Sequence, residues 1–196
     1  MEQLRHLYLP EWQSVSGKLS FARLFNLQTL VNVSNEKCNL NDLVHLSNLK
    51  KLRIRRLRRA GRTKLKDDQI KILEKLPNLR VLYLNRLSFE SETLVFSQGG
   101  FPHLEFLTLN RLFDLKEWRV EEEAMPSLQR LRIQLCYKLR AVPDELQEIT
   151  TLKELTIDGM PSRFCSRVRE GGEDFYKIKH VPSYGMEEAA VTLIRN

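Results

Sequence analysis

The sequence lacks long apolar runs and has few cysteines, and both shortages narrow the class of protein. No run of 18 apolar residues occurs, so we expect no membrane-spanning helix, and the first ten residues lack the apolar core of a secretory signal. The three cysteines, Cys38, Cys136 and Cys165, form no CxxC pair and have no zinc-ligand spacing. Because small secreted repeat domains are often closed by clustered disulfides, the absence of such a cluster favours a reducing, intracellular compartment.

Motifs typical of enzymes are also missing. The sequence has no GxSxG, HExxH or phosphate-binding loop. Its four histidines, His6, His45, His103 and His180, lie in four separate segments. For Cys136, a buried small side chain is a simpler interpretation than a reactive thiol. We therefore expect no enzymatic activity, no metal site and no cofactor.

Positive charge is concentrated in one stretch of the chain. The net charge is +7, and residues 50–66, KKLRIRRLRRAGRTKLK, contain ten of the 32 lysines and arginines and no acidic residue. The rest of the chain has 22 basic and 25 acidic residues, a balance of −3. The basic character is therefore a property of this one segment.

Leucine recurs at a regular spacing. Residues 128–139, LQRLRIQLCYKL, follow the pattern L-x-x-L-x-L-x-x-N/C-x-L, with Ile133 at the third leucine position and one additional residue before Leu139. Segments of this kind begin at Leu4, Leu27, Leu49, Leu79, Leu104, Leu128 and Leu152, with gaps of 22 to 30 residues. Each such unit has an apolar flank that it cannot bury alone, so it is stable only when stacked on its neighbours.

This periodicity predicts an α/β leucine-rich-repeat solenoid. We expect a short horseshoe arc with a parallel β-ribbon on the concave face and short helices, turns and loops on the convex side. The predicted organisation is about seven repeats over residues 1–160, a C-terminal cap over 161–182 and a weakly ordered tail over 183–196. Nothing polar precedes the first repeat to cover its apolar face, so we also expect further repeats or another domain upstream. Asn32 replaces a strand leucine, which predicts a bulge there.

Residues between the strand leucines supply the candidate site. They face the concave side, because side chains alternate along a strand. One column of such positions holds Arg56, Arg86 and Arg111 in three successive repeats, and neighbouring columns add further cations and aromatic rings. The candidate partner-binding residues are Lys51, Arg53, Arg55, Arg56, Tyr83, Arg86, Phe106, Arg111, Arg130 and Arg132.

Several interpretations of this surface remain open. A basic ribbon suits the carboxylates of another domain or of a separate protein, because arginine pairs with them through two hydrogen bonds. The same arginines can instead splay into solvent without a partner. The segment can also be purely structural, with recognition elsewhere in the parent protein. Nucleic-acid binding is the weaker alternative, since few aromatics interleave with the cations and no recognition motif accompanies them.

The C-terminal half of the sequence resembles a known family. Residues 115–168, from LKEWRVEEEAMPSLQRLRIQLCYKL to PSRFCSRV, and residues 171–183, GGEDFYKIKHVPS, closely resemble the C-terminal end of plant coiled-coil NB-ARC leucine-rich-repeat disease-resistance proteins. The segments LRHLYLP and NLQTLVNVS are similar to earlier repeats of the same group.

The resemblance implies the sensing region of a cytoplasmic immune receptor. In that family the repeats pack on the nucleotide-binding NB-ARC module to keep it inactive, and they sense a pathogen effector or a guarded host protein. The family's repeats carry no catalytic residues to transfer. The nucleotide-binding motifs themselves are absent from this sequence, so binding of ADP or ATP is not assigned to these residues.

Overall fold

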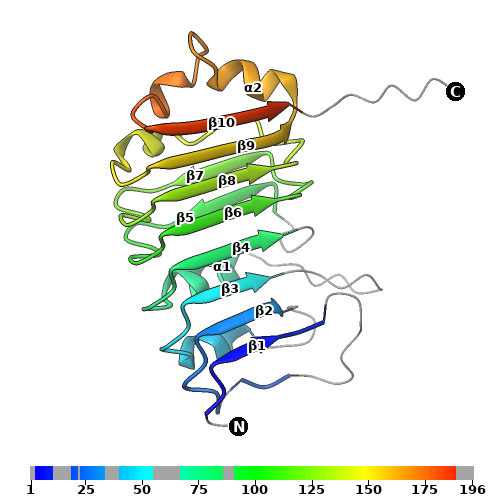
Figure 1. The fold of residues 1–196 in the computed structure, drawn as a ribbon, viewed down its shortest axis with the longest axis vertical. Helices are drawn as coiled ribbons and strands as arrows, with labels where there is room; N and C mark the ends of the chain where they lie inside the picture. Colours follow the sequence, from blue (N-terminus) through cyan, green and yellow to red (C-terminus); the bar gives the residue numbers. More distant parts are fainter. Residues whose placement is uncertain are drawn as a thin grey trace, which may run out of the picture.

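A parallel sheet of eight strands forms one side of the molecule. The structure is a computed structural model that describes residues 3–10, 19–21, 23–33, 40–54, 67–85 and 91–188. The strands stack one above the next, and all their arrows point the same way (Figure 1). In spatial order they are β1 (His6–Tyr8), β2 (Thr29–Val33), β3 (Lys51–Ile54), β4 (Val81–Asn85), β6 (Phe106–Asn110), β8 (Arg130–Gln134), β9 (Glu154–Met160) and β10 (Ser183–Glu188). The predicted leucine-rich-repeat solenoid is confirmed.

Alternation of side chains along the strands builds the core. Leu52, Leu82, Leu107 and Leu131 pair in register across four strands, and each is at most 1% exposed. The residues on either side of each leucine are half-buried or exposed. Because strand side chains point alternately to opposite faces, the leucines fill the interior and the intervening residues form the concave face. The predicted facing is therefore confirmed.

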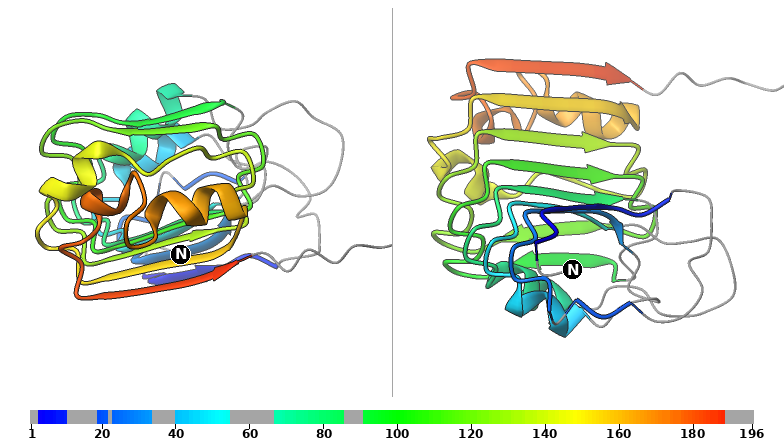
Figure 2. Two further views of the ribbon diagram at one scale, coloured as in Figure 1. Left: turned by 90° about the horizontal axis from the view of Figure 1, so that it is seen from above. Right: turned by 60° about the horizontal axis from the view of Figure 1, so that its bottom comes forward.

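Short elements build the opposite side of the solenoid. η1 (Leu40–His45), α1 (Asp67–Glu74) and η2 (Asp144–Glu148) lie across the interior from the strands, as the view down the stack shows (Figure 2). In α1 the spacing of Ile70 and Leu73 turns both side chains to the core, and both are buried. Pro143 precedes η2, where its fixed φ favours the start of a helical turn.

Two repeats have a strand instead of a helix on this side. β5 (Thr93–Phe96) pairs in parallel with β7 (Glu117–Val120) in a second sheet that the leucine pattern does not predict. The ring centroid of Phe96 lies 4.8 Å from that of Phe101 and 5.8 Å from that of Trp118, both in edge-to-face arrangement. All three rings are buried, so aromatic packing stabilises this sheet.

The predicted irregularity at Asn32 is present. The pairing of β2 with β3 shifts register between Val31 and Val33, and Asn32 has a φ of 63°. Asparagine tolerates this left-handed backbone better than most residues, which explains its presence at a strand-leucine position. Its side-chain Nδ2 donates to the carbonyl oxygen of Leu9 at 3.0 Å, so the bulge also ties β2 to the first repeat.

Polar side chains join four of the described repeats to the repeat before them. They lie immediately before the first leucine of a repeat and donate to a backbone carbonyl of the preceding one. The bonds run from Asn48 to Phe25 (2.9 Å), from Asn78 to Ser47 (2.8 Å), from Ser127 to Pro102 (3.0 Å) and from Thr151 to Pro126 (3.0 Å). These bonds supply hydrogen-bond donors to backbone carbonyls in the turns, which lie outside the hydrogen-bond ladder of the sheet.

The last repeat is followed by two short helices and a strand. α2 (Ser162–Val168) and η3 (Phe175–Lys177) fold over this end of the solenoid. Residues 183–188, which we expected in a weakly ordered tail, instead form β10 in parallel register with β9. Tyr184 pairs with Leu155 and Met186 with Ile157, so a tyrosine and a methionine occupy the positions that leucine holds in earlier repeats. A leucine pattern therefore misses this strand.

A buried ion network fastens the cap to the sixth repeat. Lys177 donates through Nζ to Asp174 Oδ1 at 2.8 Å, to Asp144 Oδ1 at 2.6 Å and to the carbonyl oxygen of Val142 at 3.0 Å. Arg167 donates to both carboxylate oxygens of Asp174, at 2.7 and 3.1 Å. Asp174 is 2% and Lys177 6% exposed. Buried charges are costly unless paired, and here each has a partner of opposite sign.

The facing of β8 gives a first prediction. Leu131→Asp places a carboxylate in the core, so we expect unfolding of the central repeats. Arg132→Asp changes an exposed neighbour and should alter the free energy of unfolding by about 0.5 kcal/mol or less. Thermal melts followed by circular dichroism compare the two variants, and equal losses would contradict the assigned facing.

The cap network gives a prediction about pH. Burial acts to raise the pKa of Asp174, but hydrogen bonds from Arg167 and Lys177 outweigh burial, so the pKa lies below its usual value. A carboxyl with a lowered folded-state pKa stabilises the fold above its unfolded pKa of about 3.9, and this contribution is lost as the pH falls through the folded value. The free energy of unfolding should therefore decline between about pH 5 and about pH 2.

Asp174→Asn tests this assignment, because it keeps the shape and removes the charge. It should lower the free energy of unfolding at pH 7 by about 2 kcal/mol and flatten the decline in acid. Urea unfolding at a series of pH values measures both effects. A variant whose pH dependence matches that of the wild type would show that this carboxyl does not stabilise the fold.

Candidate functional site

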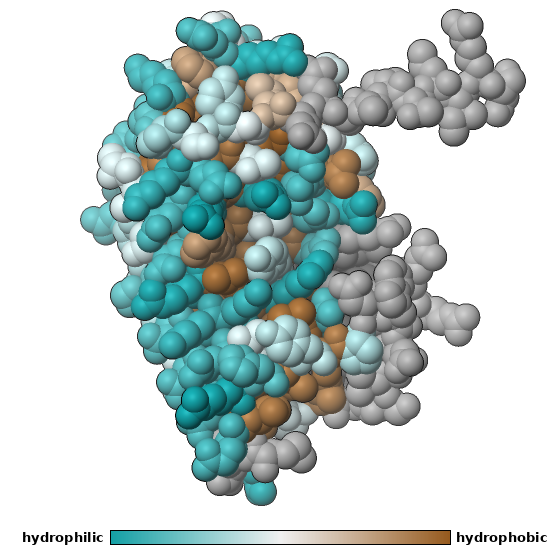
Figure 3. Space-filling model, in the orientation of Figure 1, coloured by the Kyte–Doolittle hydropathy of each residue, from teal (hydrophilic) through white to brown (hydrophobic). Residues whose placement is uncertain are grey.

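The concave face contains a shallow hollow over its middle strands. Its volume is about 390 Å³. In the space-filling view polar side chains cover most of this face, with apolar patches between them (Figure 3). We call this the concave hollow, and it is lined by Tyr8, Val31, Lys51, Arg53, Tyr83, Leu84, Asn85, Thr108, Asn110, Arg132 and Gln134. Four of the predicted site residues, Lys51, Arg53, Tyr83 and Arg132, are among them.

Two cations of β3 converge on one aromatic ring of β4. Lys51 Nζ lies 5.7 Å and Arg53 Cζ 5.9 Å from the ring centroid of Tyr83. The reason is geometric, since Arg53 pairs directly with Tyr83 and Lys51 is on the same face two residues earlier. In the part of the chain that the structure describes, neither cation has a carboxylate partner, and Arg53 Nε is buried without an acceptor. The ring partly compensates the two charges and leaves their donors free.

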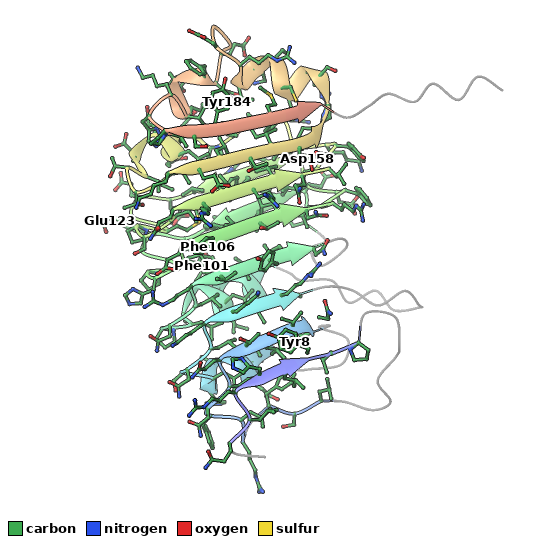
Figure 4. All side chains as sticks on the ribbon, viewed as in Figure 1. Tyr8, Phe101, Phe106, Glu123, Asp158 and Tyr184 are labelled. Atoms are coloured by element: carbon green, nitrogen blue, oxygen red, sulfur yellow. The ribbon has the colours of Figure 1, made fainter. Side chains whose placement is uncertain are left out.

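Arg130 and Phe106 form a second cation–aromatic pair on the same face. Arg130 Cζ lies 5.0 Å from the ring centroid of Phe106, and Figure 4 shows Phe106 on the strand surface. Unlike Arg53, Arg130 also has an ionic partner, because its Nε lies 3.1 Å from Glu154 Oε2. Both predicted residues are therefore on the concave face, but the charge of Arg130 is already balanced.

The structure describes only part of the predicted arginine column, which Leu135 and Gly159 continue in the two repeats after Arg111. Of its residues the structure describes Arg111, Leu135 and Gly159, and these have φ values of 54°, 54° and 60°. Arg111 and Leu135 follow directly after β6 and β8, whereas Gly159 lies within β9. Exposure along the column falls from the exposed Arg111 to the buried Gly159. The other predicted arginines, Arg55, Arg56 and Arg86, lie outside the described residues.

A polar ladder borders the concave hollow and was missed from the sequence. Asn110 Nδ2 donates to Gln134 Oε1 at 2.9 Å, and Gln134 Nε2 donates to Asp158 Oδ2 at 2.8 Å. Asn85 pairs with Asn110 in the adjacent strand. Because a carboxylate only accepts, Asp158 fixes which way each amide points. Figure 4 shows Asp158 toward the carboxyl ends of the strands.

Groups that could support other chemistry are buried or dispersed. Burial raises the pKa of the Cys136 thiol to about 11, which disfavours the reactive thiolate, and its Sγ lies 3.3 Å from the carbonyl oxygen of Gln134. The described residues contain no group of three or more His, Cys, Asp or Glu side chains that is placed to hold a metal ion. Among them, no helix combines the length and the apolar character needed to cross a membrane.

Comparison with known proteins gives a consistent set of relatives. No family model matches the chain. Probable disease resistance RPP8-like protein 2 of Arabidopsis thaliana is 44% identical over 61% of this chain and 13% of its own length. Disease susceptibility protein LOV1 of the same plant is 44% identical over 61% of this chain and 13% of its own length. Putative disease resistance protein At1g59780, also of Arabidopsis thaliana, is 31% identical over 93% of this chain and 26% of its own length.

The chain thus spans between 13 and 26% of the length of these relatives. The similarity to the third of these relatives extends over 93% of the chain, and the strand register gives its repeats one architecture. The chain is a leucine-rich-repeat solenoid, and the proteins to which its sequence is similar are plant disease-resistance and disease-susceptibility proteins.

Proposed function

We propose that the chain is the protein-recognition region of an intracellular plant immune receptor and that its concave face binds a protein partner. The partner is a pathogen effector or a guarded host protein, and the nucleotide-binding module of the same receptor packs on the repeats to stay inactive. The relatives' names, disease resistance and disease susceptibility, support the immune role. We place this activity in the cytoplasm and assign no catalytic step or cofactor to these residues.

The observation that carries the proposal is the set of unpaired cations in the concave hollow. Lys51, Arg53 and Arg132 line it and have no carboxylate partner among the described residues. Arginine and tyrosine are enriched among the residues that dominate binding energy at protein interfaces, and the hollow contains both. A partner that supplies carboxylates would form charge-assisted hydrogen bonds at these positions.

The buried residues next to these side chains favour binding without a large rearrangement of the strands. Lys51 and Arg53 alternate with Leu52 and Ile54, which are fully buried. A shift of the exposed residues would therefore require movement of the core, which packs at nearly crystalline density. Binding groups on such strands are held more firmly than groups on loops.

Charge reversal tests the proposal directly. We expect Lys51→Glu, Arg53→Glu and Arg132→Glu together to lower the capture of specific leaf proteins by the tagged chain at least about tenfold, because like charges across an interface are repelled. The measurement is quantitative mass spectrometry of proteins captured from plant leaf tissue. Folding of the variant is checked by circular dichroism, because Lys51 and Arg53 are half-buried and only Arg132 is exposed.

The matched control makes the same change of charge elsewhere. Three exposed cations lie away from the concave face: Lys75 on the side opposite the eight-stranded sheet, and Arg163 and Lys179 in the cap. Their replacement by glutamate should leave capture unchanged. If both triple variants retain the wild-type partners, the concave face is not the interface, and the alternative of a purely structural segment is favoured. Loss of leaf RNA alone from the concave variant would favour the nucleic-acid alternative.

A further inference from the structure

We propose that Lys51, Arg53 and Tyr83 form a binding site for a phosphorylated serine or threonine of the partner protein, and that Arg132 binds a second acidic residue of the same segment. This inference rests on the proposed function, because it names the chemistry of the partner at the concave face. It concerns one half of the hollow, where two cations share one ring.

The two cations of β3 lie two residues apart on the same face of the strand and against the same ring. Both lie within 6 Å of the Tyr83 ring centroid, Lys51 Nζ at 5.7 Å and Arg53 Cζ at 5.9 Å. Arg53 is half-buried, and its Nε has no acceptor among the described residues. The rest of its guanidinium group belongs to a side chain that lines the hollow, so an anion there can form charge-assisted hydrogen bonds with Arg53 as well as with Lys51.

Charge balance favours a phosphate monoester over a carboxylate. A phosphorylated serine carries about −1.5 to −2 charges at pH 7 and offers three acceptor oxygens. One carboxylate would neutralise only one of Lys51 and Arg53. Acidic side chains of the chain itself do not fill this role, since Glu154 pairs with Arg130 and Asp158 accepts from Gln134.

Strand spacing places the second cation at a defined distance. Arg132 lies in the same column as Arg53, with Tyr83 and Thr108 in the two strands between them. Three steps of about 4.8 Å give roughly 14 Å between their backbones. An extended peptide covers this distance in about four residues. The preferred segment therefore has an acidic residue about four positions from the phosphorylated one.

The aromatic rings argue against a nucleic acid as the phosphate donor. Proteins that bind single strands stack bases on exposed aromatic rings. On this face Lys51 and Arg53 lie over the Tyr83 ring, and Arg130 lies over the Phe106 ring. Tyr8, which also lines the hollow, is exposed, but one exposed ring does not form the succession of stacking surfaces that a single strand uses. The amide ladder of Asn110 and Gln134 instead offers hydrogen bonds suited to a peptide.

Three fluorescent peptides test the site on the full chain. Each has a central serine within a glycine, alanine and serine background and acidic residues four positions before and after it, so that either chain direction is covered. The first carries phosphoserine and two glutamates, the second serine and two glutamates, and the third phosphoserine and two glutamines. Fluorescence anisotropy gives the dissociation constants.

We expect loss of the phosphate to weaken binding at least about tenfold, in line with hydrogen bonds to charged groups. Loss of the glutamates should weaken binding about threefold, because Arg132 is exposed and exposed ion pairs contribute little. Arg53→Gln and Lys51→Gln should each weaken binding of the first peptide at least about fivefold. Lys179→Gln, which removes an exposed cation of the cap, should leave it unchanged. If Arg53→Gln lowers the melting temperature, Lys51→Gln alone decides the outcome.

Three results would overturn the inference. They are equal binding of the phosphorylated and unphosphorylated peptides, an equal effect of Lys179→Gln and Lys51→Gln, and equal competition by a single-stranded oligonucleotide with the same number of phosphates. If the charge-reversed triple variant loses its leaf partners while the peptides bind equally, phosphate recognition is wrong and recognition through the concave face stands. If the peptides discriminate while leaf capture is unaffected, the anion site is real and the proposed function fails.

Discussion

Burial of leucine between neighbouring repeats is the interaction on which the rest of the structure depends. No repeat can cover its own apolar flank, and each leucine becomes inaccessible only when the next strand pairs in register, as Leu82 does between Leu52 and Leu107. Fully burying one such side chain contributes about 1.5 to 3 kcal/mol. The side-chain bonds before each first leucine, such as that of Asn78, and the ion network of the cap stabilise the two places where this packing is incomplete: the turns and the end of the stack.

The same register determines the chemistry of the concave face. Because apolar residues fill the inward positions, the side chains between them are not constrained by the core and can differ from repeat to repeat. Neighbouring repeats then place unlike groups side by side, as Arg53 beside Tyr83, and Thr108 beside Arg132. Two kinds of cation result: Arg130 is balanced by Glu154, whereas Lys51, Arg53 and Arg132 have no carboxylate partner in the described part of the chain.

The sequence predicts this fold well because the repeat uses one residue type at one spacing. The inward facing of Leu131 and the bulge at Asn32 both follow from that spacing. The leucine spacing does not predict β5 and β7, whose buried residues include the aromatic Phe96 and Trp118. It also misses β10, where Tyr184 and Met186 stand at leucine positions. The amide ladder depends on which polar side chains become neighbours across strands, and the turn at Arg111 depends on a backbone angle that residue type alone does not reveal.

The central claim is that the free cations of the concave hollow meet the anionic groups of a partner protein. Zero-length coupling of lysine amines to carboxylates, followed by mass spectrometry of the chain with a protein captured from leaf tissue, tests it most directly. The account predicts that Lys51 is the principal lysine joined to the partner's aspartate or glutamate residues, because its Nζ is in the hollow and unpaired among the described residues. Coupling confined to Lys75, on the side opposite the eight-stranded sheet, and Lys179, in the cap, would contradict it.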